Sequence, residues 1–266
     1  MLKTESKYGR KALIAGASEG LGAAFSDFLA KAGLDLLLVA RRRKVLESFA
    51  SSLRERYNTK VSAVCCDLSS PDALNQLMQA VDVSEIDILI YNAALSFIGN
   101  FEIDSPEHLM QIATANMITP LKLVRAVSEE MLKKGRGAVI LMSSLAGFQG
   151  SGFLSAYAAT KAFNRVLAEG LWYEWKERGV DVLACCAGAT ATNNYKLTNP
   201  GKPGLFAPAV QTPEEVVIEC FAQLGKKPSI VTGLGNKLAN FVMQRLVPRK
   251  TAVKIMGDTT RKIYRI

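Results

Sequence analysis

The sequence predicts an α/β protein in which a mainly parallel, seven-stranded sheet has helices on both faces. Short apolar segments alternate with longer amphipathic segments along most of the chain, as expected for strands joined by helical crossovers. Several apolar segments, such as residues 34–40 and 87–92, lack the two-residue alternation of a half-exposed strand. Both faces of the sheet are therefore expected to be covered, in a single doubly wound domain.

The expected strands and helices follow one another in a regular order. Strands are predicted at residues 12–16, 34–40, 61–67, 87–92, 138–143, 180–187 and 229–232. Helices are predicted at residues 20–31, 44–57, 71–81, 106–134, 155–178 and 213–224. Proline suits the first turn of a helix, and Pro71, Pro106 and Pro213 are expected there.

The composition fits one soluble domain. Of 266 residues, 49% are hydrophobic and 21% are charged, which excludes a disordered or fibrous chain. No apolar run is long enough to cross a bilayer, and the first residues lack a secretion signal. We therefore expect a cytoplasmic protein, or one that is peripheral at a membrane surface.

Cysteine and histidine predict neither a metal site nor histidine-based catalysis. Cys65, Cys66, Cys185 and Cys186 lie in expected strands, where free buried thiols are the simplest interpretation. The one histidine, His108, is expected to be a solvated helix residue. No bound metal is expected.

A glycine-rich turn, AGASEGLG, follows the first expected strand at residues 15–22. Glycine permits a tight turn and a close approach of backbone to a pyrophosphate at a helix N-terminus. Packing alone is the alternative, but the position after the first strand favours dinucleotide binding. The residues of this turn expected to bind the cofactor are Gly16, Ser18, Glu19, Gly20, Leu21 and Gly22.

Arginines stand where dinucleotide sites often carry a carboxylate. That carboxylate lies about 20 residues after the glycines, at the end of the second strand, where this chain has Arg41, Arg42 and Arg43. A guanidinium pairs well with a 2′-phosphate, although a solvated helix start is the alternative. NADP(H) is therefore preferred over NAD(H), with Arg41 and Arg42 as ligands. At the end of the third strand, Asp67, beside Leu68, either faces the adenine end of the cofactor or caps the next helix.

Ser144, Tyr157 and Lys161 form the most informative group. Tyr157 and Lys161 are four residues apart in an expected helix, so both side chains lie on one face. A free phenol has a pKa of about 10, and a neighbouring ammonium lowers it. Tyr157 is therefore a candidate general acid or base. A buried ring beside a solvated lysine is the structural alternative.

With these motifs in order, the chain resembles the short-chain dehydrogenase/reductase family. The resemblance covers roughly residues 11–233 and rests on AGASEGLG, YNAA at residues 91–94, Asn116, SSLAG with Ser144, and YAATK from Tyr157 to Lys161. The chain is similar in particular to the branch with fatty 3-oxoacyl reductases and hydroxysteroid dehydrogenases. The resemblance implies a Rossmann-type fold and hydride transfer between nicotinamide and a carbonyl or alcohol carbon.

The resemblance also implies roles for individual residues. Tyr157 would donate a proton to the carbonyl oxygen, and Ser144 would hydrogen-bond that oxygen. Lys161 would lower the pKa of Tyr157 and hold the nicotinamide ribose, while Asn116 would anchor a water that relays protons to Lys161. Further cofactor contacts are implied for Asn92, Ala93, Tyr157, Lys161, Gly188, Thr190 and Thr192.

Three positions depart from the family's pattern. Ala15, Ala94 and Ala187 stand where the family usually has threonine, glycine and proline. None of them removes a proton-transfer group. The departures bear on turn geometry and cofactor affinity more than on catalysis.

The positive charge of the chain is concentrated in its tail. Residues 226–266 carry ten Lys and Arg against one acidic residue, whereas the preceding residues carry 23 of each sign. Leu238, Phe241, Val242 and Leu246 recur there at helical spacing. This stripe suggests either a subunit contact or cap over the substrate, or a helix that rests on an anionic membrane or attracts an acyl carrier or coenzyme A thioester. Nucleic acid is not expected as a partner.

Residues 1–233 are thus expected to form a dinucleotide-binding catalytic domain, and residues 234–266 a basic amphipathic extension. The Gly/Pro-rich segment 198–208 predicts a lid over the substrate. The resemblance implies NADP(H)-dependent reduction of a hydrophobic ketone or 3-oxoacyl substrate, in a homodimer or homotetramer. The alternatives are a catalytically silent nucleotide-binding regulatory or scaffold protein and a peripheral membrane protein that uses the basic tail.

Overall fold

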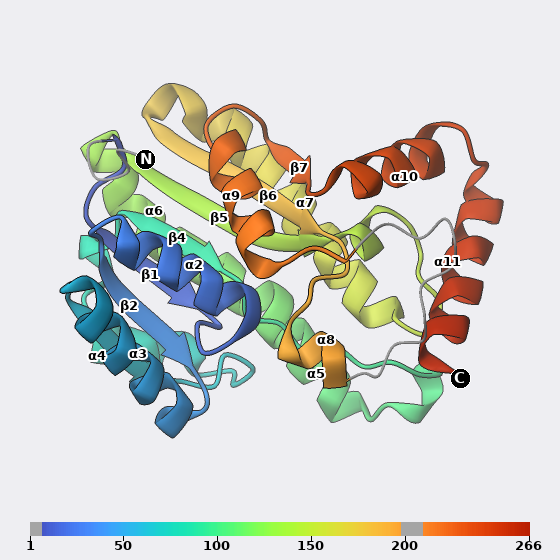
Figure 1. The fold of residues 1–266 in the computed structure, drawn as a ribbon, viewed down its shortest axis with the longest axis horizontal. Coiled ribbons are helices and arrows are strands. Elements are labelled where there is room, and N and C mark those ends of the chain that lie inside the picture. The colour runs from blue at the N-terminus through green and yellow to red at the C-terminus, as the bar shows by residue number, and fades with distance from the viewer. Residues whose placement is uncertain (1–6, 198–209) are drawn as a thin grey trace.

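The structure, a computed structural model, describes residues 7–197 and 210–266 around a parallel sheet (Figure 1). Among the described residues the sheet has seven strands in the order β3-β2-β1-β4-β5-β6-β7, and every neighbouring pair is parallel. The strands are β1 (Lys11–Ala15), β2 (Asp35–Ala40), β3 (Val61–Cys65), β4 (Ile88–Tyr91), β5 (Gly137–Ser144), β6 (Val180–Ala187) and β7 (Ser229–Val231). The strand order reverses between β1 and β4, which confirms the doubly wound fold.

Five of the six predicted helices are present with small differences at their ends, the expected extension over residues 234–266 forms two helices, α10 and α11, and α8 is not predicted from the sequence. The α-helices are α2 (Gly20–Lys31), α3 (Arg43–Tyr57), α4 (Ala73–Ala80), α5 (Pro106–Ala113), α6 (Thr119–Lys134), α7 (Ser155–Trp175), α8 (Asn193–Leu197), α9 (Pro213–Gln223), α10 (Leu234–Arg245) and α11 (Arg249–Tyr264). Short 3-10 turns lie at Val83–Glu85, Phe101–Ile103, Leu145–Phe148 and Lys176–Arg178. The expected lid at residues 198–208 lies outside the described residues.

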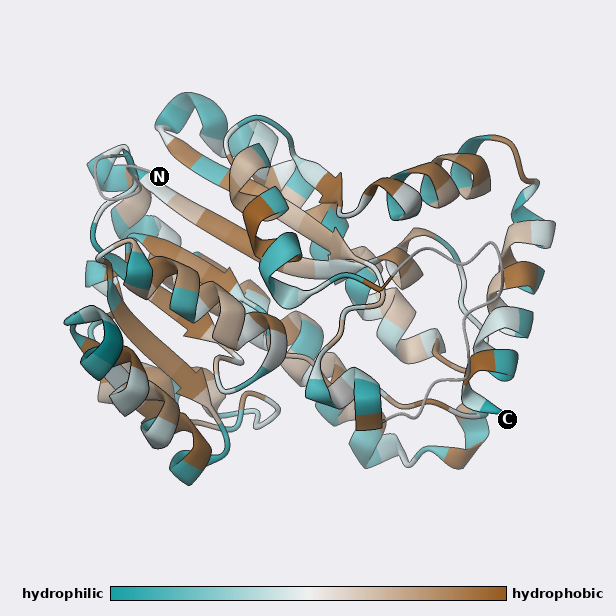
Figure 2. Ribbon diagram, in the orientation of Figure 1, coloured by the Kyte–Doolittle hydropathy of each residue, from teal (hydrophilic) through white to brown (hydrophobic). Residues whose placement is uncertain are grey.

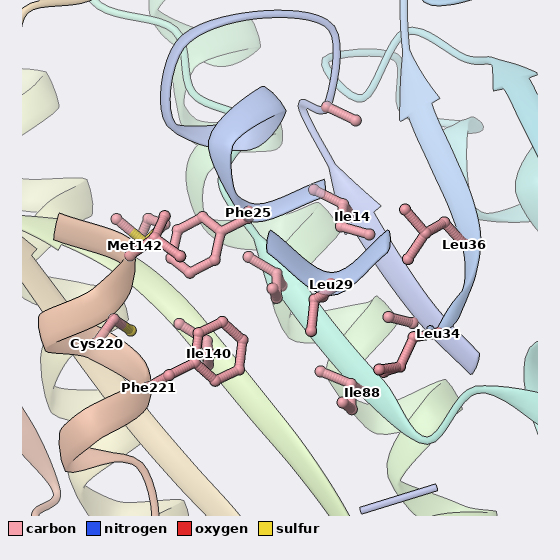
Figure 3. Close-up of a cluster of buried hydrophobic side chains, with 14 of the residues drawn as sticks. Ile14, Phe25, Leu29, Leu34, Leu36, Ile88, Ile140, Met142, Cys220 and Phe221 are labelled. Atoms are coloured by element: carbon pink, nitrogen blue, oxygen red, sulfur yellow. The ribbon is translucent and has the colours of Figure 1, made fainter. Parts of the chain in front are cut away.

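Both faces of the sheet are buried, which explains the continuous apolar runs of its strands. In β1, Ile14 belongs to a cluster with Phe25 of α2, whereas its neighbour Leu13 belongs to the cluster on the opposite face. Figure 3 shows the first cluster, where α2 and α9 cover the sheet and the rings of Phe25 and Phe221 meet edge to face at 6.0 Å. The second cluster includes residues of α4, α6 and α7.

The helix expected over residues 106–134 is interrupted. A π segment at Thr114–Ile118 separates α5 from α6. Pro120 has no N–H to donate to the carbonyl of Asn116 four residues earlier, so the ordinary α-helical ladder cannot continue there. Inside the segment, the carbonyl oxygen of Ala115 accepts a 2.6 Å hydrogen bond from the hydroxyl of Tyr91.

Two further predictions about single residues are wrong. Pro71 precedes α4, whose N-cap residue is Asp72, although Pro106 and Pro213 do lie in first turns. Cys65 is exposed, at the end of the edge strand β3. The other cysteines are buried, and all five are free thiols: Cys65, Cys66, Cys185, Cys186 and Cys220.

His108 lies in α5, as expected, but it is not simply solvated. Its side chain is 36% exposed, and its Nδ1 lies 2.6 Å from the carboxylate of the nearly buried Asp104. Within the described residues no group of three or more His, Cys, Asp or Glu side chains could hold a metal ion.

The last two helices run along the edge of the molecule, far from the β1–β3 half of the sheet (Figure 1). They pack on the segment that follows β5. Gln244 of α10 donates to Gln149 at 2.6 Å, and Arg249 of α11 donates to the carbonyl of Phe148 at 2.9 Å. In the described part of the chain, no helix has the length and hydropathy needed to span a bilayer.

Candidate active site

The glycine-rich turn is shaped by close backbone contacts. Gly16 has φ +80°, and a Cβ there would lie 2.7 Å from the backbone of Ala93. A Cβ on Gly22 would lie 1.9 Å from the carbonyl oxygen of Gly16. The amide of Asn92 donates to that same carbonyl at 3.0 Å. The turn between β1 and α2 is therefore held against the end of β4, and only glycine fits at positions 16 and 22.

The N-terminus of α2 offers backbone donors to an anion. Its N-cap residue, Glu19, makes no side-chain capping bond, and the first turn contains no acidic residue. The first N–H groups of a helix have no partner within the helix and carry partial positive charge. Because glycines keep this turn clear of side chains, the residues present fit a dinucleotide pyrophosphate.

Arg42 lies beside the glycine-rich turn. Its guanidinium is 2.8 Å from the carboxylate of Glu19 and donates to the hydroxyl of Ser18 at 3.3 Å. This ion pair holds Arg42 next to the turn and has no signal in the sequence, because Glu19 and Arg42 belong to different segments. Arg41 is exposed at the end of β2. Arg43 begins α3, whose first turn has no acidic residue, so Glu19 is the carboxylate that pairs with Arg42.

Asp67 does not cap a helix. Its carboxylate accepts hydrogen bonds from the backbone N–H of Ser69 at 3.0 Å and from the Ser69 hydroxyl at 2.7 Å, whereas α4 begins six residues later. The capping alternative is therefore wrong. Leu68 is buried, and its carbonyl accepts a hydrogen bond from Thr119 at 2.9 Å.

Ser144 and Tyr157 come together at the carboxyl edge of the sheet. Ser144 ends β5, and Tyr157 lies in the first turn of α7. Burial raises the pKa of Tyr157, and a hydrogen bond with Ser144 acts in the opposite direction. The expectation that Lys161 lowers this pKa is not met, because removal from water is the largest influence. Tyr157 is therefore protonated at neutral pH and can serve as an acid.

Lys161 is buried between α7 and β5. Its ammonium donates to the carbonyl of Met142 at 2.9 Å and lies 5.5 Å from the centre of the Tyr157 ring. Burial lowers the pKa of Lys161 to about 8. The structural alternative of a solvated lysine is therefore excluded, since the side chain is 3% exposed.

Asn116 is buried in the π segment, and its side chain is fully hydrogen-bonded. Its amide oxygen accepts from the N–H of Leu95 at 2.8 Å, and its nitrogen donates to the Leu95 carbonyl at 2.8 Å and to the Thr160 hydroxyl at 3.0 Å. The Thr160 hydroxyl in turn donates to the carbonyl of Tyr157 at 2.8 Å. The side chain thus links the end of β4 to α7, which leaves the backbone carbonyl of Asn116 as the group that could hold a water.

The segment Gly188–Thr192 reaches back to the glycine-rich turn. A Cβ on Gly20 would lie 2.9 Å from the Thr192 side chain. Thr192 also accepts a hydrogen bond from the N–H of Tyr195 at the start of α8. The hydroxyl of Thr190 donates to the carbonyl of Gly188 at 3.2 Å. The two cofactor-binding segments predicted from sequence therefore lie side by side.

A buried polar network, which sequence analysis missed, supports that segment. Gln211 exchanges backbone hydrogen bonds with Ala189 and Ala191, and its side-chain oxygen accepts from Thr232 at 2.7 Å. Asn236 of α10 donates to the Thr232 carbonyl at 2.9 Å. A Cβ on Gly188 would lie 2.5 Å from the Asn236 amide. No short sequence motif indicates this network, because its members come from three separate segments of the chain.

The C-terminal helix α11 also comes close to Tyr157 of the candidate catalytic group. Gly257 of α11 packs against Gly152, because a Cβ added to Gly152 would lie 3.3 Å from the Cα of Gly257. The guanidinium of Arg261 lies 5.0 Å from the centre of the Phe153 ring. Tyr264, two helical turns beyond Gly257 on the same face, contributes to raising the pKa of Tyr157. The sequence pointed to a tail helix but not to its contact with this site.

Fold and site together define a nucleotide-binding oxidoreductase, and comparison with known proteins identifies the family. The short chain dehydrogenase family model matches residues 10–202. The chain is 34% identical to the 7beta-hydroxysteroid dehydrogenase of Clostridium sardiniense, over 87% of this chain and 88% of that one. It is 26% identical to the very-long-chain 3-oxoacyl-CoA reductase of Anas platyrhynchos, over 96% and 81%. The protein belongs to the short-chain dehydrogenase family.

Solved structures agree with this assignment. A 7beta-hydroxysteroid dehydrogenase structure superposes with a TM-score of 0.88 at 30% identity, covering 95% of this chain and 98% of the other. A short-chain dehydrogenase from Sphingobium yanoikuyae in complex with NADPH gives a TM-score of 0.75 at 31% identity, covering 84% and 86%. The family resemblance inferred from motifs is confirmed.

The buried ammonium of Lys161 should make stability depend on pH. In the folded protein Lys161 loses its proton above about pH 8, whereas in the unfolded chain it keeps the proton up to about pH 10.4. Between these two pH values the unfolded chain binds more protons, so the free energy of unfolding rises with pH. Lys161→Met should lack this rise and unfold at a higher temperature at pH 7. Thermal unfolding at pH 7 and pH 9.5 measures both effects. Lys122→Met, at an exposed position, is the control and should behave as wild type; an identical pH response in Lys161→Met would contradict the assignment.

Removing the amide of Asn236 should loosen the Gly188–Thr192 segment. Asn236→Ala leaves the buried Thr232 carbonyl without its donor, which should lower the free energy of unfolding by about 1–3 kcal/mol. Urea denaturation measures the change. Asn240→Ala, on the same helix but outside the network, should have a much smaller effect. Equal losses in the two variants would show that the network is not the cause.

Proposed function

We propose that the protein is an NADP(H)-dependent reductase of a hydrophobic ketone or 3-oxoacyl substrate. The observation that carries the proposal is the group of half-buried Ser144 and Tyr157 with buried Lys161 at the edge of the sheet that carries the glycine-lined turn. In this group a phenol is kept protonated, a hydroxyl hydrogen-bonds to it, and an ammonium lies within reach. These are the groups needed to protonate an oxygen as a carbonyl is reduced.

Each residue has a role that follows from its surroundings. Ser144 would hydrogen-bond the substrate oxygen, and Tyr157 would donate its proton to that oxygen. Lys161, with a pKa of about 8, would stabilise the negative charge left on the phenol and exchange protons near neutral pH. Asn116 would position Leu95 and α7, and its backbone carbonyl would hold the water that resupplies protons. A bound nicotinamide supplies the hydride.

The cofactor is expected to be NADP(H). Arg42 is held beside Ser18 and Glu19 of the glycine-rich turn, and its guanidinium would pair with the 2′-phosphate of a bound NADP(H). The NADPH complex of the Sphingobium yanoikuyae relative supports the same choice. The remaining contacts would come from the α2 N-terminus, the Asp67–Leu68 and Asn92–Ala93 segments, and residues Gly188, Thr190 and Thr192.

The substrate class follows from the relatives. A 7beta-hydroxysteroid dehydrogenase and a very-long-chain 3-oxoacyl-CoA reductase are both named for large, mostly apolar substrates. Helix α11, with Tyr264 near Tyr157, would form one wall of the site. We further propose that the protein acts as a homodimer or homotetramer in the cytoplasm, with residues 1–233 as the catalytic unit.

A catalytically silent nucleotide-binding protein is the weaker alternative. Burying the ammonium of Lys161 disfavours the folded state, as its lowered pKa shows. A protein without turnover would gain nothing from keeping this group.

Replacing the phenol should test the proton donor directly. Tyr157→Phe keeps the ring but removes the O–H, and NADPH oxidation with the best of a panel of steroid ketones and 3-oxoacyl thioesters should fall by at least about 10²-fold. NADPH binding should change little. Tyr173→Phe, on the exposed end of α7, should keep wild-type turnover. A wild-type rate in Tyr157→Phe would show that another group donates the proton.

Replacing Arg42 should change cofactor preference. Arg42→Ala removes the guanidinium expected to pair with the 2′-phosphate, so NADPH binding should weaken by about tenfold or more while NADH binding changes little. Fluorescence titration with both nucleotides measures the ratio. Arg54→Ala, far along α3, is the control. Equal binding of NADH and NADPH to the wild-type protein would exclude the proposed preference.

A further inference from the structure

Helix α10 buries the polar side chain of Asn236 and exposes a stripe of large apolar side chains. Asn236 is 3% exposed and donates to the Thr232 carbonyl, and the half-buried Gln244 donates to Gln149. Leu234 and Leu238 on the opposite side are 83% and 66% exposed. A helix on the surface of a soluble domain normally does the reverse. This inversion indicates that something covers the outer side of α10.

The exposed residues form one continuous surface. Positions 234, 238, 241 and 245 fall within a narrow angular range on an α-helix, since 3.6 residues make a turn. Figure 2 shows the resulting apolar segments of α10 at the edge of the molecule. The outer face of α10 is defined here as Leu234, Lys237, Leu238, Phe241, Arg245 and Leu246, of which the four apolar members are 55–83% exposed.

The C-terminal part of the chain that carries this face is strongly basic. Residues 226–266 carry ten of the chain's 33 cationic side chains and one acidic residue, while the rest of the chain is neutral. Within the described ranges, no carboxylate forms an ion pair with Arg245, Lys250 or Lys254. Lys237 is the exception, because Glu219 lies 2.7 Å away. The partner must therefore accept apolar side chains and carry negative charge.

A second copy of the chain fits these requirements poorly. The 12-residue helix is about 18 Å long, so its outer face alone supplies only part of the roughly 800 Å² per partner of a stable protein interface. Pairing two such faces would also bring two tails of like charge together. An anionic bilayer has neither difficulty, because its phosphates attract cations and its acyl boundary takes up leucine and phenylalanine.

We propose that the outer face of α10 docks on an anionic lipid surface, with Leu234, Leu238 and Phe241 entering the headgroup boundary and Arg245 contacting lipid phosphates. The helix lies flat on the surface and does not enter the hydrocarbon core. The inner side of α10 keeps the hydrogen bond of Asn236 to the Thr232 carbonyl. The helix would therefore dock while it stays packed on the domain that carries the candidate active site. The inference does not depend on the proposed reaction.

Vesicle cosedimentation of the full chain tests the proposal. The wild-type protein should sediment with vesicles of phosphatidylcholine and phosphatidylglycerol at low salt, remain in solution with phosphatidylcholine alone, and be released at high salt. The double variant Leu238→Ser/Phe241→Ser should bind at least about tenfold more weakly. Arg245→Gln should bind about fivefold more weakly.

The matched control removes two exposed apolar residues elsewhere. Met78→Ser/Ile218→Ser, at positions that are 47% and 59% exposed on α4 and α9, should bind like wild type. Thermal unfolding and NADPH binding confirm that each variant is folded. The proposal is overturned if the wild-type protein ignores anionic vesicles, or if the double variant binds them equally well. It is also overturned if the double variant lowers the oligomeric mass in light scattering, because copies of the chain would then cover the face.

Discussion

The site depends on an ammonium buried against the central sheet. Lys161 lies between α7 and β5 and donates to the carbonyl of Met142. Removal from water lowers its pKa to about 8 and keeps the phenol of Tyr157 protonated. A charge in such a position disfavours the folded state, so the rest of the fold must supply the stability that tolerates it. The two buried clusters on either face of the sheet do so.

The segments around that ammonium are positioned mainly by backbone contacts. The glycine-rich turn is pressed against Ala93, and Gly20 against Thr192, at distances that leave no room for a Cβ. The side chain of Asn116 joins Leu95 to Thr160, which in turn binds the carbonyl of Tyr157. These contacts are made by amides, hydroxyls and glycines. They therefore hold the segments of the candidate site in place without adding a charge near the hydroxyl of Tyr157.

The C-terminal helices link the site to the outside of the molecule. Asn236 supports the segment of Gly188 from the inner side of α10, while α11 extends along the segment before α7 and brings Tyr264 near Tyr157. The 7beta-hydroxysteroid dehydrogenase structure covers 95% of this chain, compared with 84% for the Sphingobium yanoikuyae protein. The apolar outer side of α10 therefore belongs to a helix whose inner side supports the Gly188 segment.

The sequence alone determined the strands, most helices, the family and the residues of the candidate catalytic group. These features depend on local periodicity and on motifs whose members are close in the chain, such as Tyr157 and Lys161. Only the tertiary structure showed that Arg42 pairs with Glu19, that Gln211 and Asn236 support Gly188, and that the stripe of α10 faces outward. It also reversed the expected direction of the Tyr157 pKa, because burial depends on what the rest of the chain places around a residue. Contacts between distant segments have no periodic signature, so spacing could not reveal them.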